Sequence, residues 1–431
     1  MHKETKKAAD QKLVQRVNRT ITLRCIRDFG PISRTDIAKR TSLSKASISE
    51  ITTFFMEKGM VQEVQEGISN RGPKPILLDL NPNRFCALGI VIGVKYLHIG
   101  ALNLCGEIVI TRKHKWPLSR ESEDNLSIVI DQVNQMLKEE IDPRKLLGIG
   151  VCVPAPIDFQ KGTLKTPPNM PEEWNGFPLR GYIEERLNVP VFLENDANAG
   201  ALGELWWGAG RDIKNMVYML VDTGVGGGLI IDGKIYKGAR GTAGEIGHII
   251  VTSNGSPCGC GGDGCLEAMV SAPAIVEKVR RKLKVGVQET VLNKFQNKLE
   301  ELEIDDILEA VEAKDAFAIK IIETAGHLMG LIIVDIINIT DPEKVVIGGP
   351  YVNDVLLSAI KETVWENDAR HIHEEMEVVK SELGNNALIM GAATLVLENF
   401  FLNPKILEED QMHSRGDASS HNMEEVMLIE H

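Results

Sequence analysis

Four side chains that bind metals well stand close together in this chain, in a stretch that is also rich in glycine. They are His248, Cys258, Cys260 and Cys265, and glycines occupy positions 259, 261, 262 and 264 between them. One imidazole and three thiolates make the closed tetrahedral shell that Zn²⁺ takes in structural sites, with no position left for a reacting water. Three unliganded cysteines would leave so glycine-rich a loop with too little side-chain volume to order it. The stretch therefore predicts a structural zinc site.

The other cysteines and the N-terminus indicate the compartment. Cys25, Cys86, Cys105 and Cys152 are isolated among apolar residues, which predicts small buried thiols. Residues 1–12 are polar and do not resemble a secretory leader, and no apolar run approaches the roughly 20 residues that span a bilayer. We expect a cytoplasmic protein that does not enter membranes, where clustered cysteines indicate a metal rather than disulfides.

The charge of the chain is unevenly distributed. The 431 residues suit two or three domains, and their net charge of −13 argues by itself against a nucleic-acid binder. Residues 1–75, however, hold 15 lysines and arginines against 8 acidic residues. A basic N-terminal part can accumulate on a polyphosphate surface, while the acidic remainder stays soluble and away from it.

Residues 1–80, which we call the head, carry the pattern of a winged helix-turn-helix. Apolar spacing predicts a helix over 13–29, ended by Gly30 and Pro31. Ser33 can cap a second helix, and Ser44 a third that stops at Gly59. Residues 60–82 then read as two strands joined by a turn of glycine, asparagine and proline, which is a wing.

The DNA contacts expected of such a head lie at two places. The N-terminal part of the third helix enters the major groove in this motif, so its first residues should face base edges, and basic residues at the wing tip suit phosphates or the minor groove. These residues are Ser44, Lys45, Ala46 and Ser47 on the helix, and Arg71 and Lys74 on the wing. A protein-docking module is the alternative, but the positive charge and the small polar residues favour DNA.

The rest of the chain alternates β-rich and helical runs, which predicts an α/β body. Asn195 and Asp196 directly follow an apolar strand, where α/β proteins bind ligands, and a carboxylate there can accept a hydrogen bond from a sugar hydroxyl or act as its general base. Asparagine followed by aspartate is also a common turn and helix cap. The glycine-rich residues 222–229 could cradle a phosphate, although such turns are frequent in this fold class.

Taken in order, these motifs resemble the ROK family of bacterial repressors, open reading frames and sugar kinases, over about residues 17–393. The resemblance is closest to its xylose-repressor-like members with an N-terminal winged helix. It implies an actin-like sugar-kinase fold of two α/β lobes, a smaller one formed by 81–198 with about 380–400 and a larger one formed by 199–379 with the zinc. Residues 403–431 lie beyond it and are expected to be a flexible tail or a partner-binding segment.

The resemblance also implies the sugar contacts, which are Asn195, Asp196, Glu245, His248 and Glu267. In this picture His248 touches both zinc and sugar, so the metal site is coupled to ligand binding.

The chain departs from the family's kinases at the phosphate loop. Kinases of the family have Asp-x-Gly-Gly-Thr, and the aligned residues are Val91, Ile92, Gly93, Val94 and Lys95. The acidic residue that organises magnesium-ATP is gone, and Val94 would obstruct a phosphate. Gly348 and Gly349 are likewise followed by Pro350 in place of a third glycine. We therefore expect no enzyme, with Asp196 a vestigial base.

The function that follows is a sugar-responsive repressor. We expect a homodimer or a dimer of dimers to place two heads on an inverted repeat in double-stranded operator DNA, and a small sugar effector in the cleft between the lobes to change DNA affinity. The alternative is an ATP-dependent sugar kinase carrying a regulatory head, which Asp196 would serve as general base.

Overall fold

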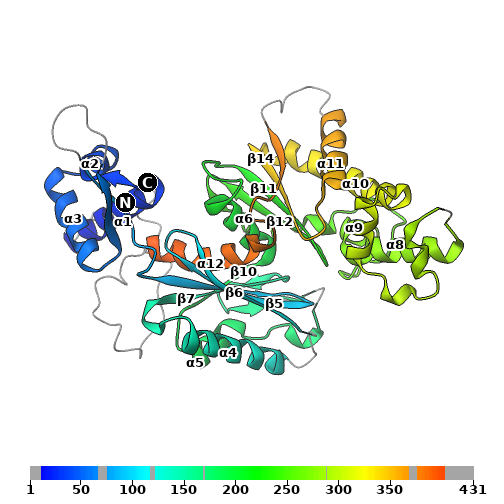
Figure 1. The fold of residues 1–431 in the computed structure, drawn as a ribbon, viewed down its shortest axis with the longest axis horizontal. Coiled ribbons are helices and arrows are strands. Elements are labelled where there is room, and N and C mark those ends of the chain that lie inside the picture. The colour runs from blue at the N-terminus through cyan, green and yellow to red at the C-terminus, as the bar shows by residue number, and fades with distance from the viewer. Residues whose placement is uncertain are drawn as a thin grey trace, which may run out of the picture.

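The computed structural model describes residues 11–66, 75–116, 122–167, 170–287, 289–367 and 376–402. Figure 1 shows a small head at one end, followed by two lobes that each contain a β-sheet. The predicted fold class is confirmed, because the head is a helical unit with a small sheet and the body has two α/β lobes.

The head forms as its capping residues predict. Its elements are α1 (Gln11–Phe29), β1 (Ile32–Ser33), α2 (Arg34–Thr41), α3 (Lys45–Glu57), β2 (Val61–Glu66) and β3 (Ile76–Leu80). The Ser33 side chain accepts a hydrogen bond from the Asp36 amide at the start of α2, and Ser44 accepts one from the Ser47 amide at the start of α3. Between these helices Ser42 has φ 58°, which makes the tight turn. The two predicted wing strands pair antiparallel, and β1, which was not predicted, joins them.

The first lobe has a five-stranded sheet in the order β10-β7-β4-β5-β6. Its elements are β4 (Cys86–Ile92), β5 (Tyr96–Asn103), β6 (Ile108–Lys115), α4 (Ser122–Glu139), β7 (Leu146–Val153), β8 (Ile157–Asp158), β9 (Thr163–Leu164), α5 (Leu179–Leu187) and β10 (Val191–Asn195). Helices α4 and α5 cover one face of the sheet and share a core with it. The last helix of the described chain, α12 (Ala387–Leu402), returns to cover the other face.

The second lobe has a sheet in the order β13-β12-β11-β14-β15. Its elements are α6 (Asp196–Trp207), β11 (Met216–Val221), β12 (Val225–Ile231), β13 (Lys234–Ile235), α7 (Glu267–Val270), α8 (Ala272–Val285), α9 (Ile304–Glu312), α10 (Ala316–Thr340), β14 (Lys344–Gly348), α11 (Asp354–Asn367) and β15 (Glu377–Lys380). Alternate residues of β11 separate the two faces, as strand geometry requires. Val217 and Met219 pack on the helical layer of α8 to α11, while Met216 and Tyr218 pack on α6.

Helices α6 and α12 cross between the two sheets with their backbones in contact. A Cβ atom on Gly391 would overlap the carbonyl oxygen of Ala199, and one on Gly203 would overlap that of Ala387. Glycine is required at both positions for this reason. The crossing joins the helix that covers the first sheet to the helix that covers the second.

Two helical segments are long and apolar enough to cross a membrane by length and composition, α10 and residues 384–402. In this structure both contribute to the hydrophobic cores, α10 to the second lobe and α12 to the core beneath the head. Core helices of folded domains pass the same test. Of the isolated cysteines, Cys25, Cys86 and Cys152 are buried as predicted, whereas Cys105 is only half-buried.

Candidate functional site

A cavity of about 360 Å³ lies between the two lobes. The five predicted sugar contacts, Asn195, Asp196, Glu245, His248 and Glu267, all line it. They come from the end of β10, the start of α6, the loop before the metal-ligand cluster and the start of α7. Residues that lie up to 72 positions apart in the sequence therefore share one cavity.

Asn195 and Asp196 are held where β10 passes into α6. The Asn195 side-chain oxygen accepts hydrogen bonds from the amides of Ala197 at 2.9 Å and Asn198 at 3.3 Å, so it caps the helix. Asp196 Oδ1 also accepts from the Ala197 amide, at 2.8 Å. Both readings of this asparagine–aspartate pair therefore apply: it is a helix cap and it lines a cavity.

The acidic groups of the cavity raise one another's pKa values. The pKa of Asp196 is raised to about 7, chiefly by burial and also by the negative charges of Asp222 and Glu245, against the lowering effect of the Ala197 amide. Burial also raises the pKa of Glu245, which His248 lowers and Glu267 raises. A carboxyl group with a pKa near neutrality can accept a hydrogen bond from a hydroxyl when it is ionised and donate one to a hydroxyl when it is protonated.

Three charged cavity residues were missed from the sequence: Asp222, Lys95 and Lys113. Burial raises the pKa of Asp222, and the two lysines oppose that rise. The Lys113 ammonium lies 4.3 Å from the centre of the Tyr96 ring, within cation–π range. Lys95 could have been noticed, because it replaces the threonine of the kinase loop. Lys113 lies on a strand with no distinguishing motif.

The Cys/His cluster has the dimensions of a metal site. The ligand atoms of His248, Cys258, Cys260 and Cys265 all lie within 4.8 Å of one another. The Cys260 and Cys265 sulfurs are 3.7 Å apart, and Cys258 Sγ is 3.6 Å from His248 Nδ1. A tetrahedral ion with Zn–S bonds of about 2.3 Å requires sulfurs about 3.8 Å apart, whereas a disulfide requires about 2.05 Å. The cluster can therefore bind a metal ion.

His248 connects this cluster to the cavity. Its Nδ1 faces Cys258, and its Nε2 lies 3.7 Å from Glu245 Oε2. Glu267 makes a second connection, because Oε2 accepts a hydrogen bond from the Val225 amide at 3.0 Å while Oε1 lies 4.0 Å from Cys258 Sγ. An ion held at the cluster would thereby fix the orientation of two cavity residues.

The glycine-rich residues 222–229 serve packing rather than an open amide cradle. The Val225 amide is bonded to Glu267, and the Gly227 amide to the Gly244 carbonyl at 2.8 Å. A Cβ on Gly228 would come within 2.5 Å of Ala197 O, so this glycine lets β12 approach α6. Neither amide is free for a phosphate.

The aligned phosphate-loop residues line the cavity without a carboxylate. The loop is closed by the Gly93 amide, which donates to the Tyr96 carbonyl at 3.0 Å, and Trp116 Nε1 donates to the Gly93 carbonyl at 3.0 Å. The side chains of Val94 and Lys95 therefore occupy the position where the kinase motif has glycine and threonine. Gly349 and Pro350 line the same cavity.

The predicted DNA-contact residues of α3 lie together at the start of that helix. Ser44, Lys45 and Ala46 are exposed and Ser47 is half-buried. The hydroxyls of Ser44 and Ser47 lie 2.9 Å apart, and the Ser44 hydroxyl also caps the helix by accepting from the Ser47 amide at 3.0 Å, so Lys45 offers the exposed cation of this turn. Arg71 and Lys74 lie outside the described residues.

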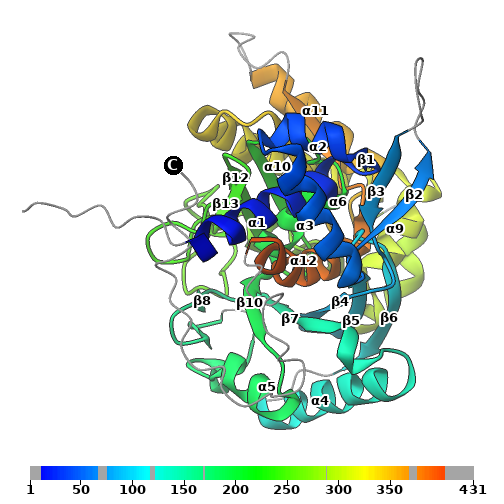
Figure 2. The same cartoon turned by 90° about the vertical axis from the view of Figure 1, so that its left-hand side faces the viewer.

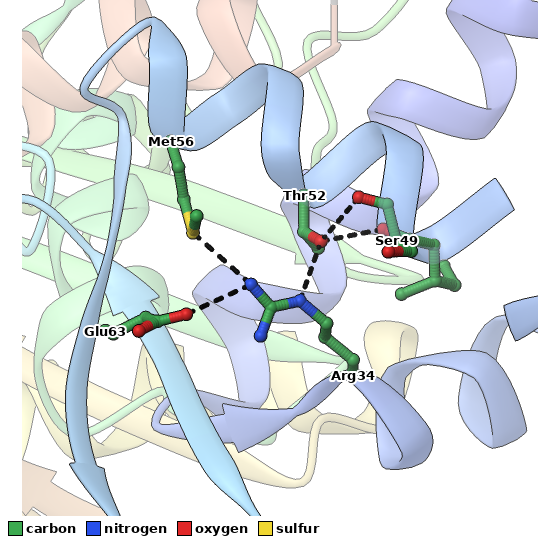
Figure 3. Close-up of polar contacts among 6 residues, drawn as sticks. Arg34, Ser49, Thr52, Met56 and Glu63 are labelled. Carbon is green, nitrogen blue, oxygen red and sulfur yellow. Dashed lines mark hydrogen bonds and ion pairs between the residues drawn. The ribbon is translucent and has the colours of Figure 1, made fainter. Parts of the chain in front are cut away.

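Arg34, which sequence reasoning missed, fixes the position of α3 (Figure 3). Its guanidinium donates to Thr52 Oγ1 at 3.2 Å and to Met56 Sδ at 3.4 Å on α3, and to Glu63 Oε1 at 3.2 Å on β2. One side chain at the start of α2 therefore holds the third helix and the first wing strand together.

These features define a winged-helix head on a two-lobed α/β body with an interlobe cavity and a Cys₃His cluster. The chain belongs to the ROK family, whose sequence profile matches residues 87–399. It is 31% identical to the xylose repressor of Caldicellulosiruptor bescii over 396 residues, 91% of this chain and 98% of that protein. It is 32% identical to the DNA-binding transcriptional dual regulator NagC of Escherichia coli K12 over 389 residues, 89% of this chain and 93% of that protein.

Solved structures of ROK family proteins are also similar to this chain. A ROK family transcriptional regulator, a homologue of the E. coli MLC protein, matches with a TM-score of 0.77 at 28% identity, over 92% of this chain and 100% of that one. A ROK family glucokinase from Streptomyces griseus, in complex with glucose and AMPPNP, matches with a TM-score of 0.65 at 27% identity, over 72% of this chain and 98% of that one. The regulator includes a counterpart for most of the chain, whereas the kinase matches a smaller part.

Proposed function

We propose that this protein is a cytoplasmic, sugar-responsive transcriptional repressor. The observation that carries the proposal is the combination, in one chain, of an exposed α3 N-terminus on a winged helix with a cavity lined by Asn195, Asp196, Glu245, His248 and Glu267. Relatives that match about nine-tenths of the chain are named xylose repressor, N-acetylglucosamine repressor and DNA-binding transcriptional dual regulator. We propose the same division into domains as for the sequence: a DNA-binding head of residues 1–80, a smaller lobe of 81–198 with about 380–400, and a larger lobe of 199–379.

The repressor would act as a homodimer, or a dimer of dimers, on an inverted repeat. Two heads related by a twofold axis match the symmetry of such an operator. Sugar in the cavity would change DNA affinity by a coupling of typically 5- to 150-fold. The Cys₃His cluster would hold a structural Zn²⁺, which would supply a fixed charge and geometry at the cavity wall. The ion would thereby hold His248 and Glu267 in the orientation in which they contact the sugar.

A thermal-shift screen tests the sugar site. D-xylose, D-glucose and N-acetylglucosamine would be compared on the wild type, and a bound sugar at 100 times its Kd should stabilise the protein by about 2.7 kcal/mol. Glu245→Gln removes a charged acceptor, so we expect the affinity of the responding sugar to fall by roughly 10- to 100-fold. Glu362→Gln, an exposed change on α11, is the matched control. No stabilisation by any sugar, or equal affinities in both variants, would contradict the site.

Lys45→Ala tests the DNA surface. Because Lys45 is exposed at the start of α3, we expect weaker binding to all duplexes and a salt-dependence slope that falls by about one per head. Fluorescence anisotropy over a salt series measures both. Lys320→Ala on α10 removes the same charge from the body and should change neither. An unaltered slope in Lys45→Ala would show that α3 does not approach phosphates.

A residual sugar kinase is the second candidate, favoured by the position of Asp196 in the cavity. It is opposed by the absence of a carboxylate among residues 91–95 and by the side chain of Val94. A coupled assay with ATP, magnesium and hexoses decides between them: turnover that Asp196→Asn abolishes would establish the kinase, and its absence supports the sensor.

A further inference from the structure

Three elements of the body each have one end in the cavity and the other end against the head. Helix α6 begins at the cavity with Asp196 and ends with Trp206 and Trp207, which pack against the core beneath the head. Helix α12 lines the cavity with Leu388 near its start and ends in that same core with Phe400. Figures 1 and 2 show α12 lying between the sheet of the first lobe and the head.

Strand β4 makes the third connection. Its last residues, Val91 and Ile92, line the cavity, and the segment before its start holds the C-terminal end of α3. Asn81 Nδ2 donates to the Gly59 carbonyl at 2.9 Å, and Arg84 Nε donates to the Lys58 carbonyl at 2.9 Å. These carbonyls directly follow the helix proposed to read DNA, so β4 links that helix to the cavity through a few residues.

One side chain of the head joins two of these elements at once. The Arg27 guanidinium carbon lies 4.2 Å from the Trp206 ring centre on α6 and 5.2 Å from the Phe401 ring centre on α12. Only 17% of the Arg27 side chain is exposed, and Asp28 Oδ1 accepts a hydrogen bond from its Nε at 2.6 Å, which orients the guanidinium. A cation–π contact is stronger when the cation is shielded from water, as this guanidinium largely is.

The two rings that Arg27 touches also contact each other. Trp206 and Phe401 lie 6.1 Å apart, so the contact depends on where α6 and α12 end relative to each other. The neighbouring Trp207 donates from Nε1 to Thr394 Oγ1 of α12 at 2.7 Å. A displacement of α6 at its cavity end would therefore reach the Arg27 contact through a helix of 12 residues, about 18 Å long.

We propose that Arg27 is the coupling residue of this protein: its contact with Trp206 and Phe401 converts the position of α6 and α12, set by sugar in the cavity, into the position of the DNA-binding head. The proposal rests on the proposed function. Arg27 does not line the cavity and does not lie on the exposed start of α3, so it is a positioning residue. Its loss should leave sugar binding intact and remove the change in DNA affinity that sugar binding causes in the wild type.

The test measures both events in wild type, Arg27→Ala and Trp206→Leu. Isothermal titration measures the affinity for D-xylose, D-glucose and N-acetylglucosamine, and anisotropy measures the affinity for a duplex selected by the wild type from a random library, with and without sugar. We expect both variants to bind sugar within about threefold of wild type, while the ratio of DNA affinities falls from about 5- to 150-fold to within about twofold of one. Trp206→Leu removes the same contact by changing its partner on α6 instead of the arginine of the head. This variant keeps the test valid if Arg27→Ala does not fold.

The control is Arg186→Ala, which removes a similar stacking contact, 3.5 Å from the Tyr182 ring, on α5, a helix that covers the face of the first sheet opposite α12. A purely structural arginine would lower thermal stability and leave the ratio of DNA affinities intact. The proposal is overturned if Arg27→Ala and Trp206→Leu keep the wild-type ratio, or if Arg186→Ala loses it equally. A wild type that binds sugar with no change in DNA affinity would refute the proposed function, and the coupling with it.

Discussion

Replacing Cys260 with serine should abolish the zinc binding that we propose for the Cys₃His cluster and destabilise the body. Cys260 Sγ lies 3.7 Å from Cys265 Sγ, and a hydroxyl is a poor substitute for a thiolate on Zn²⁺. Metal content should fall from one zinc per chain to nearly none in atomic absorption. The free energy of unfolding should drop by several kcal/mol, on the order of a third of the 10–16 kcal/mol with which structural zinc is held.

The matched control for this change is Cys105→Ser. Cys105 is half-buried and lies outside the cluster, where its thiol donates only a long hydrogen bond to the Leu80 carbonyl. This variant should keep its zinc and most of its stability. A Cys260→Ser protein with unchanged metal content and melting temperature would show that the cluster does not bind zinc.

Replacing Asp196 with asparagine should abolish sugar binding and yet stabilise the protein at alkaline pH. The asparagine side chain can still accept the hydrogen bond that the Ala197 amide gives to Asp196 Oδ1. It carries no charge, whereas the aspartate must ionise beside Asp222 and Glu245 in a buried setting. We expect a gain on the order of 2–4 kcal/mol above pH 7, at about 1.4 kcal/mol for each tenfold change in proton affinity.

The pH dependence fixes the sign of this effect. The pKa of Asp196 is about 7 in the folded protein, above the value near 3.9 of an unfolded chain. Between these values the folded state binds more protons, so wild-type stability falls as the pH rises, until the full penalty is present above pH 7. The advantage of Asp196→Asn should therefore be small at pH 4 and largest at pH 8.

Denaturant unfolding at pH 4, 6 and 8 measures this difference. Asp131→Asn, an exposed change on α4, removes a carboxylate of the same type and should give a small difference at all three values. An advantage of Asp196→Asn that does not change with pH would show that the carboxyl is not perturbed by its surroundings.

Much of this molecule could be predicted from local chemistry. Ser33 and Ser44 identified the starts of two helices because a helix cap requires only a hydroxyl and the amide three residues later. The metal-ligand cluster lies within a single short stretch of the chain, so ligands that are close in the sequence are also close in space. Asn195 and Asp196 could be assigned to a cavity because the carboxyl end of a strand is where such cavities open.

The contacts that depend on chain crossings could not be predicted. Asp222, Lys95 and Lys113 share a cavity with Asp196 only after the two sheets face each other. Lys95 and Asp222 lie in stretches that the sequence singled out for other reasons, and Lys113 has no distinctive local pattern. Arg34 and Arg27 look like ordinary surface cations in the sequence. Their roles appear once α3, α6 and α12 are packed, because the partners of each arginine come from segments tens to hundreds of residues away.

The glycine crossing of α6 and α12 limits how the two lobes can move. Backbones that touch at Gly391 and Gly203 have no compressible side-chain layer between them, so one helix cannot glide along the other without the carbonyls of Ala199 and Ala387 colliding. The motion that remains possible is a rotation of one helix relative to the other about the point where they cross. A sugar that drew the cavity walls together at one end of α6 would then displace the other end of the helix, where Trp206 and Trp207 pack against the core beneath the head.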